Sequence, residues 1–142
     1  MFTSFRMALA LFAAFAVASF APVAAQTPSP EGAKVYFINL KDGVEVDSPF
    51  LVQFGLSGMG VAPAGVEKPN TGHHHLLIDA GDSIPSGIVV PKDEHHLHFG
   101  KAQSSTDVTL PAGKHVLTLQ FADGIHRSYG SKLATTISVT VE

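Results

Sequence analysis

The eight residues A-T-T-I-S-V-T-V at Ala134–Val141 decide the fold class of this chain. Ile137, Val139 and Val141 alternate with threonine and serine, and this two-residue period is that of a strand with one buried face. β-Branched residues, which are enriched in strands, also dominate the stretch. No segment after residue 25 has sustained helical periodicity. The C-terminal stretch therefore predicts a half-buried strand in an all-β protein.

Six further short runs of strand-forming residues precede this strand, separated by Gly, Pro and Asp turn residues. They are Ala33–Asn39, Phe50–Ser57, His73–Ala80, His95–Phe99, Ser105–Leu110 and His115–Phe121. About seven strands in this length favour an antiparallel immunoglobulin-like β-sandwich over residues 33–142. A small β-barrel is the alternative.

The N-terminal segment has the layout of a secretory signal peptide. Arg6 supplies the positive charge, Met7–Phe20 is an uncharged apolar run, and Val23-Ala24-Ala25 provides the small residues of a cleavage site. We therefore expect residues 1–25 to be removed and the protein to be periplasmic or secreted. An uncleaved membrane anchor is the alternative, since the apolar run is near the length that can span a bilayer. Residues 26–32 are expected to form a flexible tail.

The composition of the mature chain excludes several classes of protein. Cleavage after Ala25 leaves 117 of the 142 residues, the length of one domain. Without Arg6 the chain has 8 basic and 12 acidic residues, a net charge of −4, and no basic cluster, so no nucleic-acid partner is expected. No further apolar segment predicts stable membrane insertion after cleavage. Because the chain has no cysteine, its core or a bound metal has to stabilise it.

All eight histidines lie between residues 73 and 126. Six of them form two groups, G-H-H-H-L-L-I-D at Gly72–Asp79 and H-H-L-H-F-G at His95–Gly100. Histidine is the commonest metal ligand in proteins. Ligation by imidazole without thiolate suits Zn(II), Cu(II) or Ni(II), and we favour copper or zinc in an exported protein.

Strand geometry sorts these histidines by face, because successive side chains point to opposite sides of a strand. If the more apolar faces point to the core, two outward H-x-H pairs remain, one in each group. Directly opposed residues on paired strands have Cβ atoms roughly 4.5–5.5 Å apart, so two such pairs on neighbouring strands can converge on one ion. A loop histidine after the Asp123-Gly124 turn can add a ligand. The predicted metal ligands are His73, His75, His96, His98 and His126.

The remaining histidines are expected to be structural. His74 and His95 lie on the apolar faces and are predicted to be hydrogen-bonded core residues. His115 is predicted to tie a turn to a strand. Asp79, at the end of its strand, is either a partner that orients a ligand imidazole or a turn residue.

Enzyme signatures are scarce in this sequence. The chain lacks G-x-S-x-G, a phosphate-binding glycine loop, H-E-x-x-H and a cysteine nucleophile. We therefore expect neither an organic cofactor nor catalysis; the alternative is an enzyme that uses a histidine-bound metal. The leading hypothesis is an exported protein that binds copper or zinc for metal homeostasis or delivery. The alternative is a non-metal binding or structural cell-envelope module, with the histidines hydrogen-bonded internally and a periplasmic protein as its partner.

Five motifs resemble those of a bacterial family of domains of unknown function, family 4399. They are G-M-G-V-A-P-A-G, G-H-H-H-L-L-I-D, H-L-H-F-G-K-A-Q-S, L-P-A-G-K-H-V-L-T-L-Q-F-A-D and H-R-S-Y-G. The resemblance extends from about Val35 to Val141 and implies a small, exported, β-rich protein without an established activity. Many members of the family carry a second histidine after the position of His126, where this chain has Arg127-Ser128-Tyr129.

Overall fold

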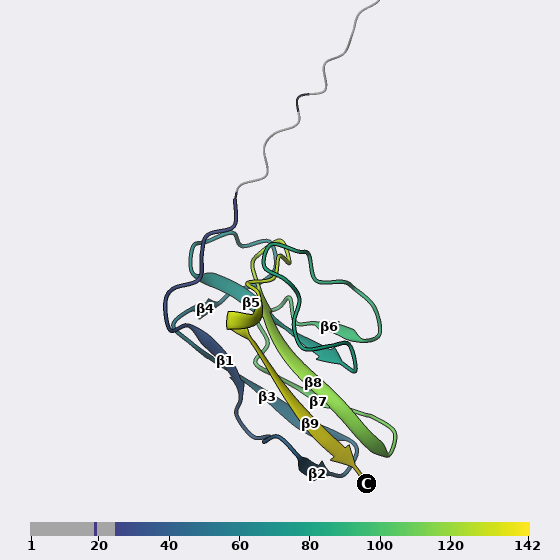
Figure 1. Ribbon diagram of the computed structural model, residues 1–142. Coiled ribbons are helices and arrows are strands. Elements are labelled where there is room, and N and C mark those ends of the chain that lie inside the picture. Colours follow the sequence, from purple (N-terminus) through teal and green to yellow (C-terminus); the bar gives the residue numbers. More distant parts are fainter. Residues whose placement is uncertain (1–18, 20–24) are drawn as a thin grey trace, which may run out of the picture.

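Two β-sheets pack against each other in the computed structural model, which describes residue 19 and residues 25–142 (Figure 1). The smaller sheet has three antiparallel strands in the order β1-β3-β7. Their bounds are Lys34–Phe37, Phe50–Ser57 and Ser105–Val108. The predicted all-β, sandwich-like fold is confirmed, and the immunoglobulin-like arrangement is consistent with these sheets.

The larger sheet has the order β2-β9-β8-β5-β4, with β6 also paired to β5. Its strands are β2 (Val44–Val46), β9 (Ala134–Val141), β8 (Gly113–Ala122), β5 (Thr71–Ile78), β4 (Gly60–Val61) and β6 (His96–His98). The short pairings β2–β9 and β4–β5 are parallel, and the others are antiparallel. A single 3-10 turn, η1 (Ser131–Leu133), precedes β9 in the described part of the chain.

The core lies between the two sheets and shows the predicted alternation. Ile137, Val139 and Val141 of β9 are buried, as are Leu119 and Phe121 of β8. Full burial of a side chain of this size contributes roughly 1.5–3 kcal/mol. The apolar faces of both sheets therefore stabilise the sandwich and fix which side chains of β5, β8 and β9 point away from it.

Strand β5 occupies the position from which the candidate site is built. One edge pairs with β8 over six residues, from His73 opposite Ala122 to Ile78 opposite Leu117. The other edge is shared, because β4 pairs near its start and β6 near its end. Figure 1 shows β6 as a short strand on the far side of β5 from β8 and β9.

All seven predicted strands occur in the structure. The bounds of Phe50–Ser57 and Ala134–Val141 are correct, whereas β5 begins at Thr71 and ends at Ile78. Asp79 ends β5 because its φ of 54° leaves the extended region. The short strands β2 and β4 were not predicted, because two or three residues carry no readable period.

The expected leader, residues 1–25, lies outside the described residues except for Ser19 and Ala25. Within the described part of the chain, no helix is long and apolar enough to span a membrane. In the expected tail, the Gln26 amide donates hydrogen bonds to the Arg127 carbonyl at 2.8 Å and to Asp123 Oδ2 at 3.4 Å.

Candidate metal centre

The triple histidine of β5 divides between the two faces of its sheet, as predicted. His74 points into the core, where its ring lies 5.3 Å from that of Phe54 and 5.0 Å from that of Phe121. His73 and His75 point to the opposite face and are 0% and 2% exposed. Their ring centroids are 4.7 Å apart. One strand therefore supplies two buried imidazoles side by side.

Strand β6 supplies the third imidazole. The register places His98 directly opposite His75, with ring centroids 5.2 Å apart. His98 Nε2 also lies 3.1 Å from His73 Nε2. The His98 ring passes over Gly100, where a Cβ atom would overlap it. The glycine that follows this histidine group therefore leaves room for the ring.

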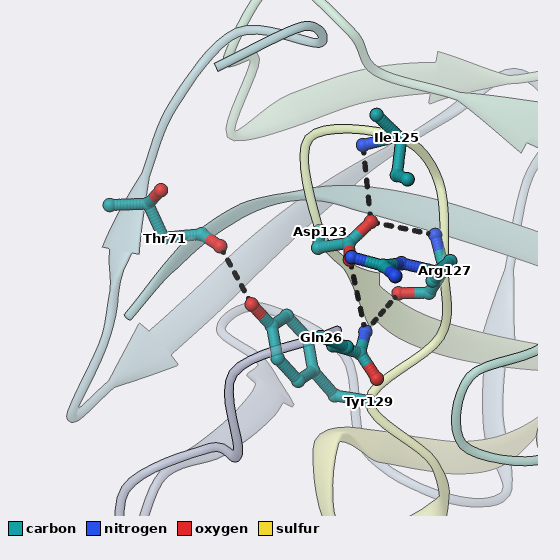
Figure 2. Close-up of polar contacts among 6 residues, drawn as sticks. All are labelled: Gln26, Thr71, Asp123, Ile125, Arg127 and Tyr129. Atoms are coloured by element: carbon teal, nitrogen blue, oxygen red, sulfur yellow. Dashed lines mark hydrogen bonds and ion pairs between the residues drawn. The ribbon is translucent and has the colours of Figure 1, made fainter. Parts of the chain in front are cut away.

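The fourth imidazole, His126, comes from the loop after β8, and Asp123 fixes that loop (Figure 2). Asp123 Oδ1 accepts hydrogen bonds from the backbone N–H groups of Ile125 at 3.1 Å and Arg127 at 2.9 Å. Its Oδ2 accepts a hydrogen bond from the Arg127 guanidinium at 2.8 Å. His126 has a φ of 69° between these anchors. This turn directs His126 toward β5, where its Nδ1 lies 3.1 Å from His73 Nε2.

A glycine-rich loop joins the segments that carry the last two histidines. The Ala64 N–H donates to the Gly100 carbonyl at 2.9 Å, and the Gly65 N–H donates to the Gly124 carbonyl at 2.7 Å. The loop that precedes the triple histidine is therefore tied to the segments that follow β6 and β8.

The four rings converge on one point. Each of them offers a nitrogen, and these nitrogens all lie within 4.8 Å of one another: His73, His75, His98 and His126. Two metal–nitrogen bonds of about 2.0–2.1 Å at the tetrahedral angle place their nitrogens roughly 3.3 Å apart. The two 3.1 Å nitrogen–nitrogen distances at His73 are close to that value. The four imidazoles could therefore hold a metal ion.

Hydrogen bonds among the rings do not account for this arrangement. An imidazole nitrogen carries either one hydrogen or one lone pair, yet His73 Nε2 has two imidazole nitrogens at 3.1 Å. The buried Nδ1 atoms of His73 and His75 also have no partner among the described residues. Leaving a buried polar atom unsatisfied costs roughly 1–3 kcal/mol. A cation among the converging nitrogens would accept the lone pair of His73 Nε2 and remove this conflict, whereas His73 Nδ1 would still lack a partner among the described residues.

The environment keeps the buried imidazoles neutral, which is the form that binds metals. Burial, and then repulsion from His98 and His126, lowers the pKa of His73 from 6.5 to about 4. Burial, and then repulsion from His73 and His98, lowers the pKa of His75 to about 2. Burial and repulsion from His126 also lower the pKa of His98.

His96 does not join the other predicted ligands. It lies on the same side of β6 as His98, but the register places it opposite Leu77 rather than a histidine. Leu77 is further from His73 along β5 than His75 is, and no nitrogen of His96 belongs to the group of converging nitrogens. Its Nδ1 instead lies 2.6 Å from Asp93 Oδ1. The structure therefore brings together four of the five predicted ligands and leaves His96 outside the cluster.

The structural histidines follow the prediction in part. His115 is confirmed as a corner residue, because its Nδ1 lies 2.8 Å from Asp79 Oδ2 and its Nε2 2.9 Å from the Pro111 carbonyl. Asp79 thus orients His115 and no ring of the cluster. His74 is buried as predicted, but neither ring nitrogen has a partner among the described residues. The core prediction for His95 is wrong, because β6 begins one residue later and the His95 side chain is 54% exposed.

Sequence reasoning missed the residues that support the cluster. Asp123 and Arg127 form an i,i+4 pair around His126, a spacing that is readable in the sequence. The segment Val89–Lys92 lies beside three of the histidines, and its sequence gives no sign of this position.

Comparison with known sequences gives one family. Residues 52–142 match the family described as "Domain of unknown function (DUF4399)". The matched range contains all four histidines of the cluster. Comparisons with curated proteins and with solved structures give no match. On the strength of this match over most of its length, the chain belongs to the DUF4399 family.

Proposed function

We propose that this protein binds one transition-metal ion, copper or zinc, through His73, His75, His98 and His126. The observation that carries the proposal is the convergence of four imidazole nitrogens within 4.8 Å of one another. A donor set of imidazoles without thiolate suits Cu(II) and Zn(II). For such a site, affinity follows the usual order of divalent metals, which puts copper above zinc.

The two sides of the cluster support a role in metal delivery or buffering. His73 and His75 are buried, whereas His98 is exposed and His126 is half-buried. An ion held on one side by buried ligands and on the other by accessible ones has a route to and from solvent. The predicted signal peptide would place this exchange outside the cytoplasm, in the periplasm or beyond it.

Metal binding is tested by calorimetry and elemental analysis on the purified mature protein. We expect one equivalent of Cu(II) or Zn(II) to bind tighter than micromolar. The variant His98→Ala should lose most of this affinity. Its matched control is His96→Ala, because His96 lies on the same side of the same strand but bonds to Asp93. Binding weaker than micromolar, or equal binding by both variants, would contradict the proposal.

The location is tested separately. Mass spectrometry of protein recovered from the periplasm of expressing cells should give an N-terminus at Gln26. An intact N-terminus in the membrane fraction would instead support the uncleaved anchor.

The second candidate is a structural module in which the histidine cluster is a hydrogen-bond network. One of the two 3.1 Å contacts of His73 Nε2, with His98 or with His126, can be a hydrogen bond, and this favours the second candidate. It predicts that His98→Ala lowers the free energy of unfolding of metal-free protein by roughly 1 kcal/mol, while metals change nothing. Unfolding measurements with and without Zn(II) separate the two candidates.

A further inference from the structure

Three of the four clustered histidines line a small cavity. His75, His98 and His126 share its wall with the segment Val89–Lys92, and its volume is about 140 Å³. A cavity needs roughly 10–15 Å³ to hold one water molecule, so this one admits a ligand of several atoms. The cavity therefore lies beside three of the four rings of the cluster.

The apolar part of the wall is fixed in place. The Val90 N–H donates to the His126 carbonyl at 2.9 Å, and the Ser128 N–H donates to the Ile88 carbonyl at 2.8 Å. Val90 itself is 5% exposed. Backbone hydrogen bonds thus hold the wall against the same loop that carries His126, and the cavity is part of the fold.

The charges around the cavity favour an anion. Lys92 belongs to the lining, and no Asp or Glu does. Lys92 is exposed and makes no ion pair with another described residue. Lys92 shares the wall of the cavity with His75, His98 and His126. A divalent ion with four neutral ligands would add two further positive charges beside it.

We propose that this cavity binds a small monovalent anion, of azide or carboxylate type, as an additional ligand to the metal, with Lys92 as its counter-charge. The inference rests on the proposed metal site. On a metal ion held by the cluster, the anion would donate a lone pair to the ion and would take the place of a water ligand. No electron or proton is transferred, so the step needs no other reactant.

The test uses the mature protein loaded with one equivalent of Cu(II) and titrated with sodium azide. We expect a saturable azide-to-copper absorption band and a changed electron paramagnetic resonance spectrum, with the copper retained after gel filtration. Lys92→Met should weaken azide binding roughly two- to fivefold, the range of an exposed ion pair. Lys92→Arg should restore it. Lys34→Met, on β1 of the other sheet, is the matched control and should bind azide like the wild type.

The outcomes separate this inference from the metal site itself. Stoichiometric copper without an azide band would overturn the anion site and leave metal binding in place. Loss of copper during the titration would show that azide removes the ion, and would also overturn it. Equal azide affinity in Lys92→Met and Lys34→Met would overturn the assignment of this cavity. Failure to bind copper at all would instead refute the proposed function.

Discussion

His74 is a buried polar side chain without a hydrogen bond to any described residue. Its ring lies between Phe54 and Phe121, and burial lowers its pKa to about 4, so it is neutral in the fold. Replacing an unsatisfied polar group by an apolar one of similar shape is nearly neutral or stabilising. We therefore expect His74→Leu to keep or raise the free energy of unfolding, by up to about 1 kcal/mol, in urea denaturation.

Gln120 provides the contrast for this substitution. It is equally buried, but its amide accepts from the Ile84 N–H at 2.9 Å and donates to the carbonyls of Gly130 and Leu133 at 3.2 Å. Gln120→Leu should cost roughly 1–3 kcal/mol, because it leaves backbone groups without partners. A larger loss for His74→Leu than for Gln120→Leu would show that the His74 ring is hydrogen-bonded in solution.

The pair formed by His115 and Asp79 makes stability depend on pH. The hydrogen bond to Asp79, and then that to Pro111, raises the pKa of His115 above 6.5. Burial raises the pKa of Asp79, but hydrogen bonds from His115 and Val116 outweigh it and lower that pKa. The stabilisation by protonated His115 is therefore complete below pH 6.5 and is lost as the pH rises through the raised pKa.

Nuclear magnetic resonance titration checks this pair. We expect the His115 pKa to lie above 6.5 in the wild type and to fall in Asp79→Asn. This variant keeps an acceptor for the Val116 N–H, which bonds to Asp79 Oδ1 at 2.8 Å. Asp79→Asn should also cost more stability at pH 6 than at pH 8.5. A pH-independent cost would contradict the role of the charge.

At the scale of single residues, the sequence predicts which face a histidine occupies but not which residue lies opposite. Alternation separates His74 from His73 and His75 because it depends only on neighbouring residues. Whether His96 lies next to the other histidines depends on the register between β5 and β6, which is set by pairing across the sheet. His126 lies in a turn that Asp123 stabilises. The turn residues Asp123-Gly124 next to this histidine were enough to predict it as a candidate ligand.

At the scale of strands, Gly72 allows β5 to approach β8. A Cβ atom at this position would overlap the carbonyl oxygen of Ala122 and contact the Phe121 ring. We expect Gly72→Ala to separate the two strands next to His73 and to lower the free energy of unfolding by about 1–3 kcal/mol, as overpacking does. Urea denaturation measures the loss.

Gly60→Ala, on the neighbouring β4, is the matched control for Gly72→Ala. A Cβ atom there would meet nothing closer than Thr71 Cγ2 at 3.6 Å, an ordinary contact. This variant should be as stable as the wild type, or slightly more stable, because alanine loses less backbone entropy on folding. Equal stability of the two variants would show that β5 and β8 tolerate a wider spacing.

The strands themselves were predictable where hydrophobic alternation extends over several residues, as in Ala134–Val141. The ends of β5 and β6 were displaced because a turn residue, Asp79, and the backbone pairing decide them. The parallel pairings β2–β9 and β4–β5 could not be predicted, because the local sequence of these segments does not indicate which strands they pair with.

At the scale of the whole molecule, bound metal should stabilise the fold. A ligand that binds only the folded state adds about 2.7 kcal/mol when its concentration is 100 times its Kd. We expect Cu(II) or Zn(II) to raise the Tm by several degrees in a calorimetric scan, and a chelator to reverse the shift. His126→Asn should abolish it, since asparagine also tolerates the positive φ of this residue. An unchanged Tm with metal in excess would contradict a site in the folded state.

The four rings come from three segments that only tertiary pairing brings together. Contacts between distant parts of a chain form late, after the entropy of closing long loops has been overcome. In small zinc modules the ion organises a chain that is otherwise unfolded. Here the sandwich has a core of its own, so we expect the reverse order: the sheets assemble first, and a metal ion would bind to a site that is already formed. The folded site, rather than the nascent chain, would then determine which metal ion is bound.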